Sequence, residues 1–253
     1  MKNLGLVSVS FRNLSCEEIV KLCIENGLTS VEWGGDIHIP AGDIAAAEEA
    51  FALCRKSNIE IAAYGSYYRV CKNETVNPPW EKVVETAAAL HAPIIRVWIC
   101  EHGSEEVSDD EFKRAVKECR EICDIAQKQN ITVCCECHPN TLTDNYIYTV
   151  KILKQVYRPN FKLYWQPNQH KSIEYNLEAI RNMKDYTLNV HTFYWEGINK
   201  LSLSCGASVW KKYLEAFGDV NPRFLLEFMP NSLTSEIPGE IKAFEEIVNG
   251  ITK

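Results

Sequence analysis

The sequence lacks several features that would place it in a class at once. It has no run of Lys or Arg, and its formal net charge is −7, which disfavours a nucleic-acid partner. No apolar run is long enough to span a bilayer, so no membrane partner is expected. The opening residues, MKNLGLVSVSFRN, have neither a long apolar core nor a small-residue cleavage site. They therefore predict a strand, not a signal peptide.

Cysteine is abundant, but its pattern does not indicate a disulfide framework. The 11 cysteines are an odd number and are scattered along the chain, and several, such as Cys23 and Cys54, lie inside apolar runs. A free cysteine behaves as a small buried hydrophobe. In a chain without a signal peptide, this usage predicts reduced thiols and a cytoplasmic location.

A Gly-rich phosphate turn is also missing: the first predicted strand runs into SVSFRNLS instead of G-x-G-x-x-G, which disfavours a doubly wound open sheet. Strand-like and helix-like segments alternate throughout. The predicted strands are 4–10, 30–34, 59–66, 94–100, 131–138, 161–167, 187–195 and 223–229. The predicted helices are 15–27, 43–57, 79–91, 108–129, 144–156, 174–183, 207–217 and 237–251.

Eight strand–helix units in 253 residues have the rhythm of one (β/α)8 barrel, because consecutive units of this kind give parallel strands with right-handed crossovers. No linker or low-complexity segment divides the chain. We therefore expect a single α/β domain, a TIM barrel spanning residues 1–253.

Polar residues gather where the predicted strands end, which is where the chemistry of such barrels lies. Side chains alternate along a strand, so each inward face can be identified. This alternation predicts that Glu136, Gln166, His191 and Glu227, from four successive strands, converge at the barrel mouth.

The stretch VCCECHPN, residues 133–140, resembles a zinc knot at first sight. The alternation directs Cys135 and Cys137 toward the helix layer and places Cys134 inside the barrel below Glu136. No second cysteine pair has ligand spacing. The functional element is therefore Glu136, with His138 beside it.

Two carboxylates, an imidazole and an amide oxygen form a hard site that suits Mn²⁺ best, with Mg²⁺, Co²⁺, Zn²⁺ or Fe²⁺ as alternatives. Such an ion polarises a carbonyl and stabilises an enediolate, while one carboxylate removes the α proton and another returns it. The alternative interpretation makes Glu136 or Glu227 part of a structural ion pair with Arg96, and His191 a core histidine.

Further residues at the strand ends are candidates for substrate binding. Two flank a Gly-Gly turn, three are aromatic residues that can stack on a sugar ring, and two are histidines in loops. These are Glu32, His38, Tyr64, Trp98, Trp195, His138 and His170.

The motifs VEWGGDIH, YGSYYR, IRVW, YWQPN, NVHTFYW and LLEF resemble the xylose isomerase-like barrels, which include ketose 3-epimerases, inosose dehydratases and endonuclease IV. The resemblance implies a metal quartet at Glu136, Gln166, His191 and Glu227. It also implies that Glu136 and Glu227 are the proton-transfer pair of the epimerases.

The chain departs from that family pattern at four places. Gln166 stands where the family usually has Asp, and Gln169, followed by His170, where it usually has His. The segment TFYWEGINK after His191 lacks the Arg of the epimerases. The third predicted strand ends in Tyr64 and Gly65 where endonuclease IV has a His ligand.

The favoured function is a divalent-metal-dependent isomerase or epimerase of a sugar or sugar derivative. A lyase or dehydratase acting on a cyclitol or keto-sugar is the first alternative, and a non-catalytic sugar-binding barrel is the second. The expected partner is a small, preferably neutral sugar, since no Lys/Arg pair marks a phosphate site. A homodimer is left open.

Overall fold

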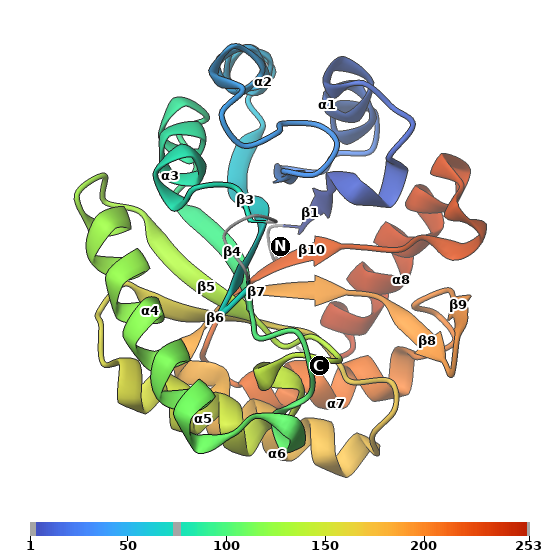
Figure 1. Ribbon diagram of the computed structural model, residues 1–253. Coiled ribbons are helices and arrows are strands. Elements are labelled where there is room, and N and C mark those ends of the chain that lie inside the picture. Colours follow the sequence, from blue (N-terminus) through green and yellow to red (C-terminus); the bar gives the residue numbers. More distant parts are fainter. Residues whose placement is uncertain (1–3, 73–76, 252–253) are drawn as a thin grey trace.

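The computed structural model describes residues 4–72 and 77–251, which form a closed barrel of parallel strands in the order β1-β10-β7-β6-β5-β4-β3-β2 (Figure 1). The predicted (β/α)8 barrel is therefore confirmed. Its strands are β1 (Leu4–Val7), β2 (Ser30–Gly34), β3 (Glu60–Val70), β4 (Ile94–Ile99), β5 (Thr132–Glu136), β6 (Phe161–Trp165), β7 (Thr187–Thr192) and β10 (Arg223–Leu226).

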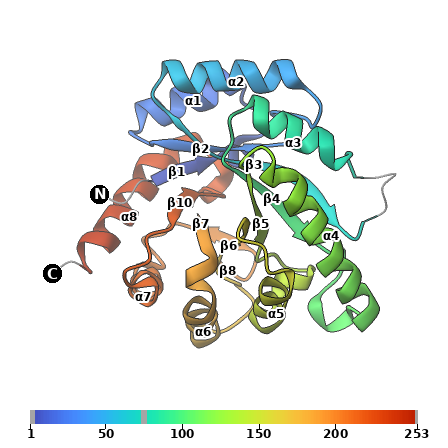
Figure 2. The same ribbon diagram turned by 90° about the vertical axis from the view of Figure 1, so that its left-hand side faces the viewer.

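The α-helices lie outside the strands (Figure 2). Across the described residues they are α1 (Cys16–Glu25), α2 (Ile44–Lys56), α3 (Trp80–Ala89), α4 (Asp109–Gln127), α5 (Tyr146–Val156), α6 (Ile173–Met183), α7 (Ala207–Phe217) and α8 (Ile237–Asn249). None of these described helices has the combination of length and apolar character that crossing a membrane requires.

Local sequence explains where the helices begin. Ser15 caps α1 by accepting a hydrogen bond from the Glu18 N–H at 3.3 Å, while the Glu18 carboxylate accepts one from the Ser15 N–H at 2.7 Å. The side chains of Ser108 and Ser172 cap α4 and α6 by accepting the N–H of Glu111 and of Tyr175. Each cap satisfies backbone donors that the first helical turn leaves unpaired.

Two layers of apolar side chains hold the barrel together. The larger layer lies between strands and helices and contains Trp165 and Trp210. The smaller layer fills the barrel interior, where the side chains of Cys134, Tyr164 and Leu225 have no exposed surface. This arrangement follows the alternation predicted for β5 and β10.

One strand prediction was wrong. The segment 187–195 is not continuous, because β7 ends at Thr192 and a separate hairpin follows. In that hairpin β8 (Tyr194–Glu196) pairs antiparallel with β9 (Asn199–Leu201). Gly197 allows the reversal, since its φ of 60° lies in the left-handed region that glycine adopts without steric cost.

Candidate active site

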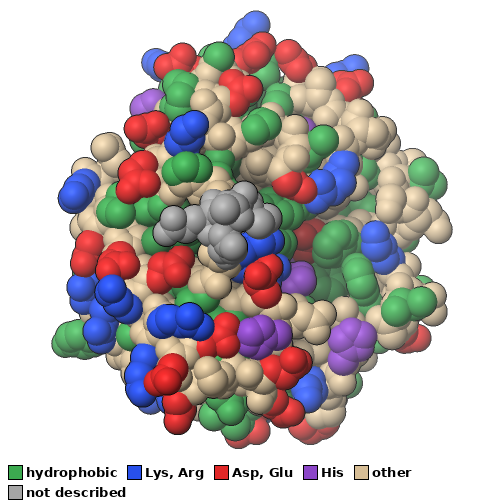
Figure 3. Space-filling model, in the orientation of Figure 1, with side chains coloured by type: hydrophobic (Ala, Val, Ile, Leu, Met, Phe, Trp, Pro, Cys, Tyr) green, Lys and Arg blue, Asp and Glu red, His purple; other side chains and the backbone are tan. Residues whose placement is uncertain are grey.

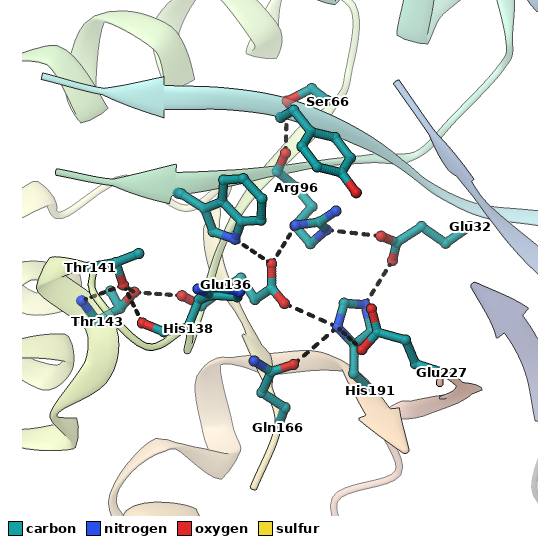
Figure 4. Close-up of polar contacts among 12 residues, drawn as sticks. Glu32, Ser66, Arg96, Glu136, His138, Thr141, Thr143, Gln166, His191 and Glu227 are labelled. Carbon is teal, nitrogen blue, oxygen red and sulfur yellow. Dashed lines mark hydrogen bonds and ion pairs between the residues drawn. The ribbon is translucent and has the colours of Figure 1, made fainter. Parts of the chain in front are cut away.

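The four residues expected to converge do so at the carboxyl ends of β5, β6, β7 and β10. Glu136 is the last residue of β5, Gln166 directly follows β6, His191 lies in β7, and Glu227 directly follows β10. All four are buried. Figure 4 shows Glu136, Gln166 and Glu227 directed at the His191 ring.

Three oxygen atoms surround one ring nitrogen of His191. Its Nδ1 lies 3.2 Å from Oε1 of Glu136, 3.3 Å from Oε1 of Gln166 and 3.4 Å from Oε2 of Glu227. A single N–H can satisfy only one of these oxygens, and Oε2 of Glu227 is buried without a hydrogen-bond partner. The site therefore has one nitrogen and three oxygen donors facing a common centre.

The other ring nitrogen of His191 contacts a carboxylate on its opposite side. Its Nε2 lies 3.2 Å from Oε2 of Glu32, whose Oε1 accepts a hydrogen bond from Nε of Arg96 at 2.8 Å. Arg96 also donates through Nη1 to Oε2 of Glu136, which accepts a second bond from Nε1 of Trp98 at 2.6 Å. The ion pair of Glu136 with Arg96, proposed as an alternative, is thus present, and it leaves Oε1 of Glu136 directed at His191.

These contacts shift the pKa values of the three carboxylates in different directions. Burial opposes ionisation of Glu136, but Arg96 and His191 lower its pKa, and His191 and Arg96 likewise lower the pKa of Glu32. Burial, together with the charges of Glu136 and Glu32, raises the pKa of Glu227 to about 7. Burial works against protonation of His191, yet the surrounding carboxylates, Glu227 first, raise its pKa well above the ordinary value.

This donor set fits a divalent metal ion. The separations from Nδ1 fall within the range of about 2.8–3.6 Å that metal–ligand bonds of about 2.0–2.2 Å produce between adjacent ligands. Metal-bound histidines commonly donate their other ring N–H to a carboxylate, as His191 does to Glu32. Oε2 of Glu227 has no hydrogen-bond partner and so keeps its lone pairs for an ion.

The four side chains of the quartet, however, contact one another directly. Within residues 4–72 and 77–251, no group of three or more His, Cys, Asp and Glu side chains is already arranged to hold a metal ion. Protonated His191 takes the place of a cation in this closed form, since its charge and that of Arg96 balance Glu32 and Glu136. Side chains that contact one another as ion pairs can separate around an ion, and the oxygen and nitrogen atoms of this quartet are the types that divalent metals bind.

The metal-free protein should lose stability as pH rises from about 6 to about 8. Glu227 and His191 both have raised pKa values in the fold, so over this range the folded protein binds more protons than the unfolded chain and the free energy of unfolding falls. Thermal denaturation of chelator-treated protein at several pH values measures this. A flat profile, or one no steeper than that of a His191→Gln/Glu227→Gln double variant, would contradict the assignment.

Aromatic side chains border the quartet on one side. Trp98 packs edge-on against Tyr67 and tilted against His138, each with ring centroids 5.0 Å apart. The Nδ1 atom of His138 contacts the Pro139 carbonyl at 2.7 Å, which leaves Nε2 as its other polar atom. Trp98 and His138 therefore lie beside Glu136, and their contact with a substrate stays a prediction.

A second aromatic cluster lies beyond His191 and Glu227. Trp195 packs against Phe193 and Phe228, and the Lys200 ammonium lies 4.9 Å from the centre of the Phe228 ring. The space-filling view shows acidic and histidine side chains in a hollow with hydrophobic side chains beside it (Figure 3). A ligand over the quartet would therefore meet apolar walls, which favour the C–H faces of a sugar ring.

Three of the predicted substrate contacts are engaged within the protein, and their contact with a substrate stays a prediction. Glu32 and Tyr64 have no exposed surface: Glu32 lies beneath the quartet, and the Tyr64 hydroxyl donates to the Ile39 carbonyl at 2.9 Å. Both ring nitrogens of His38 are engaged within the protein, by Ser8 at 3.0 Å and by the Leu14 carbonyl at 3.2 Å.

His170 is exposed on the loop after β6, and no described contact joins it to the quartet.

Sequence reasoning gave no site role to Tyr67 or Phe228. Both adopt left-handed backbone conformations, with φ of 59° and 54°, which cost bulky residues energy and occur at functional sites. No sequence signal marks such positions. By contrast, the charged Arg96 within the apolar segment IIRVWI did indicate in the sequence that a buried carboxylate has a partner there.

One curated relative shares part of the sequence. A 3-dehydroshikimate dehydratase of Bacillus anthracis is 28% identical over 170 residues. The matched stretch is 63% of this chain and 59% of the length of that protein.

Solved structures share the fold over the whole chain. The probable 3-DHS dehydratase AsbF of Bacillus anthracis has a TM-score of 0.79 at 20% identity, covering 97% of this chain and 99% of its own. An L-ribulose 3-epimerase has a TM-score of 0.77 at 12% identity, with coverages of 100% and 96%. The IOLI protein with a binding zinc atom has a TM-score of 0.74 at 15% identity, with coverages of 99% and 98%.

The family model for xylose isomerase-like TIM barrels matches residues 20–192, well over half of the 253 residues. Family and structure therefore agree on the closed barrel. The chain belongs to the xylose isomerase-like TIM barrel family.

Proposed function

We propose that this protein is a divalent-metal-dependent isomerase or epimerase of a sugar or sugar derivative. The observation that carries the proposal is the convergence of three oxygen donors on Nδ1 of His191, with Glu32 holding Nε2. Glu136, Gln166, His191 and Glu227 would hold the ion. When bound, it would polarise a carbonyl group and so acidify the neighbouring C–H bond.

The protein side chains divide the remaining work. Glu227, whose Oε2 has no hydrogen-bond partner, is the candidate to accept the proton from the carbon next to the carbonyl. Arg96 and Trp98 fix Oε2 of Glu136, which leaves Oε1 as the second carboxylate oxygen at the site. The aromatic walls would hold the apolar face of the substrate and exclude water.

Dehydration is the second candidate, favoured by the sequence similarity to a 3-dehydroshikimate dehydratase. Both reactions begin by removing a proton next to a carbonyl. An epimerase then returns a proton to the opposite face of the same carbon. A dehydratase instead expels the β-hydroxyl group, which leaves as water with one proton while a carbon–carbon double bond forms.

Elemental analysis of purified wild-type protein, with His191→Ala and Glu227→Ala beside it, tests the metal site. About one equivalent of Mn, Co, Zn or Fe in the wild type, lost in both variants, is the expected result. Because Mg²⁺ exchanges readily, the samples are measured again after Mg²⁺ is added. No metal under either condition would instead favour a non-catalytic sugar-binding barrel.

Incubation with candidate ketoses and cyclic hydroxy ketones in D₂O then separates the reactions. An epimerase gives an isomer that carries one solvent deuterium, whereas a dehydratase gives a product lighter by one water. Neither product from any of these compounds, with metal bound, would overturn the proposal of enolising chemistry.

Gln166→Asp should raise divalent-metal affinity by at least about tenfold, because an ionised carboxylate replaces a neutral amide as a ligand. Gln169→Asp is the matched control, since it adds the same charge on the same loop outside the quartet. Competition titration with a chelating dye measures both variants. Equal affinity in the two variants would count against Gln166 as a ligand.

A further inference from the structure

Two cysteines lie side by side where β3 and β4 end. Arg69 pairs with Trp98 and Val70 with Ile99, so Cys71 and Cys100 occupy the next position of the same register. The Cys100 N–H donates to the Val70 carbonyl at 3.0 Å, which extends the pairing to this point. Neighbouring strands lie about 4.7–4.9 Å apart. That spacing falls within the Cα separation of about 4.4–6.8 Å that a disulfide requires.

The backbone and the thiols both favour their proximity. Cys71 and Cys100 adopt left-handed conformations, with φ of 63° and 61°, which non-glycine residues seldom adopt. The nearness of the Cys100 thiol is the largest cause of a lowered pKa at Cys71. The nearness of Cys71, with burial, raises the pKa of Cys100. Cys71 is therefore the thiol that ionises first.

The two cysteines differ in access. Cys71 is partly exposed, whereas Cys100 is fully buried. A reagent in solution can thus reach Cys71 but not Cys100. This is the arrangement of an attacking thiol backed by a second thiol that can displace the first product.

We propose that Cys71 and Cys100 are an oxidisable dithiol that reacts with small disulfides. The Cys71 thiolate attacks one sulfur of the small disulfide, forms a mixed disulfide and releases one thiol. Cys100 then loses its proton and attacks the Cys71 sulfur, which forms the intramolecular disulfide and releases the second thiol. The protein loses two hydrogens, and the small disulfide is reduced to two thiols.

The position of this pair connects it to the rim of the site. Arg69 donates from Nη1 to the Cys100 carbonyl at 2.6 Å and lies over the Trp98 ring at 4.8 Å. Trp98 in turn binds Glu136. A disulfide would restrain the ends of both strands beside Trp98. Any effect on turnover rests on the proposed function, but formation of the disulfide does not.

Folded protein treated with oxidised glutathione tests the proposal by mass. We expect peptide mapping of the wild-type protein to join Cys71 to Cys100 with the loss of two hydrogens, and dithiothreitol to reverse the change. Cys100→Ser should stop at a glutathione adduct on Cys71, and Cys71→Ser should form neither product.

Cys205→Ser is the matched control, because Cys205 is exposed and remote in sequence from the pair. It should remove a glutathione adduct at that position and leave the cross-link intact. Wild-type protein that is modified at Cys205 while Cys71 stays unmodified and uncrosslinked would overturn the proposal. Since these readouts are masses, a failure of the enolising chemistry would not affect them.

Discussion

Glu227→Gln should reduce proton exchange at the substrate carbon by about 10²–10⁴-fold, the usual contribution of a positioned general base. Glutamine keeps the size of the side chain but cannot accept the proton. Nuclear magnetic resonance of a turned-over ketose in D₂O measures the exchange rate. The rate should be compared at saturating metal, because Glu227 is also a candidate ligand.

Glu240→Gln is the matched control for this experiment. Glu240 is also a buried glutamate, but it lies in α8 and accepts a hydrogen bond from the Leu203 N–H at 2.9 Å. It should alter stability without changing the exchange rate per folded molecule. If both variants lose exchange equally, or neither does, Glu227 is not the base.

Arg96→Met should lower the free energy of unfolding by about 3–5 kcal/mol, the usual cost of breaking a buried ion pair by removing one partner. The Arg96 side chain is 4% exposed, and Glu32 and Glu136, its partners, are 0% and 3% exposed. Methionine fills a similar volume but leaves the two carboxylates with only the charge of His191 to balance them. Equilibrium unfolding in urea of metal-free protein measures the loss.

Arg158→Met provides the comparison, because its pair with Asp124 is at the surface, with side-chain exposures of 34% and 55%. Such exposed pairs contribute about 0–1 kcal/mol. Adding Glu32→Gln to Arg96→Met should recover part of the stability by removing one uncompensated charge. If the two arginine variants lose the same free energy, the buried network does not depend on Arg96.

The order of strand–helix units was sufficient to predict the barrel, and side-chain alternation was sufficient to predict the convergence of the quartet. On β5 it separated Glu136 and Cys134 from Cys135, and the structure has this arrangement. The same rule fails on β3, where Ala62 and Ala63 both belong to the interior cluster and Tyr64 belongs to the outer one. The register between β2 and β3 shifts at this point, and the residues of β3 alone do not reveal that shift.

Other features could not be predicted from the order of residues along one strand. The depth of Glu32 depends on how neighbouring strands are staggered, which the residues of one strand do not determine. His38 follows the end of β2, where no periodicity orients a side chain. The left-handed conformations of Tyr67 and Phe228 depend on tertiary contacts, so local propensity opposes them.

The packed interior of the barrel determines the side from which a molecule can enter and leave the site. Cys134, Tyr164 and Leu225 fill the space below the quartet and have no exposed surface. A molecule that reaches His191 from the mouth therefore has a floor beneath it. Substrate and product therefore pass through the same opening. A product that dissociates slowly would prevent the next substrate from binding.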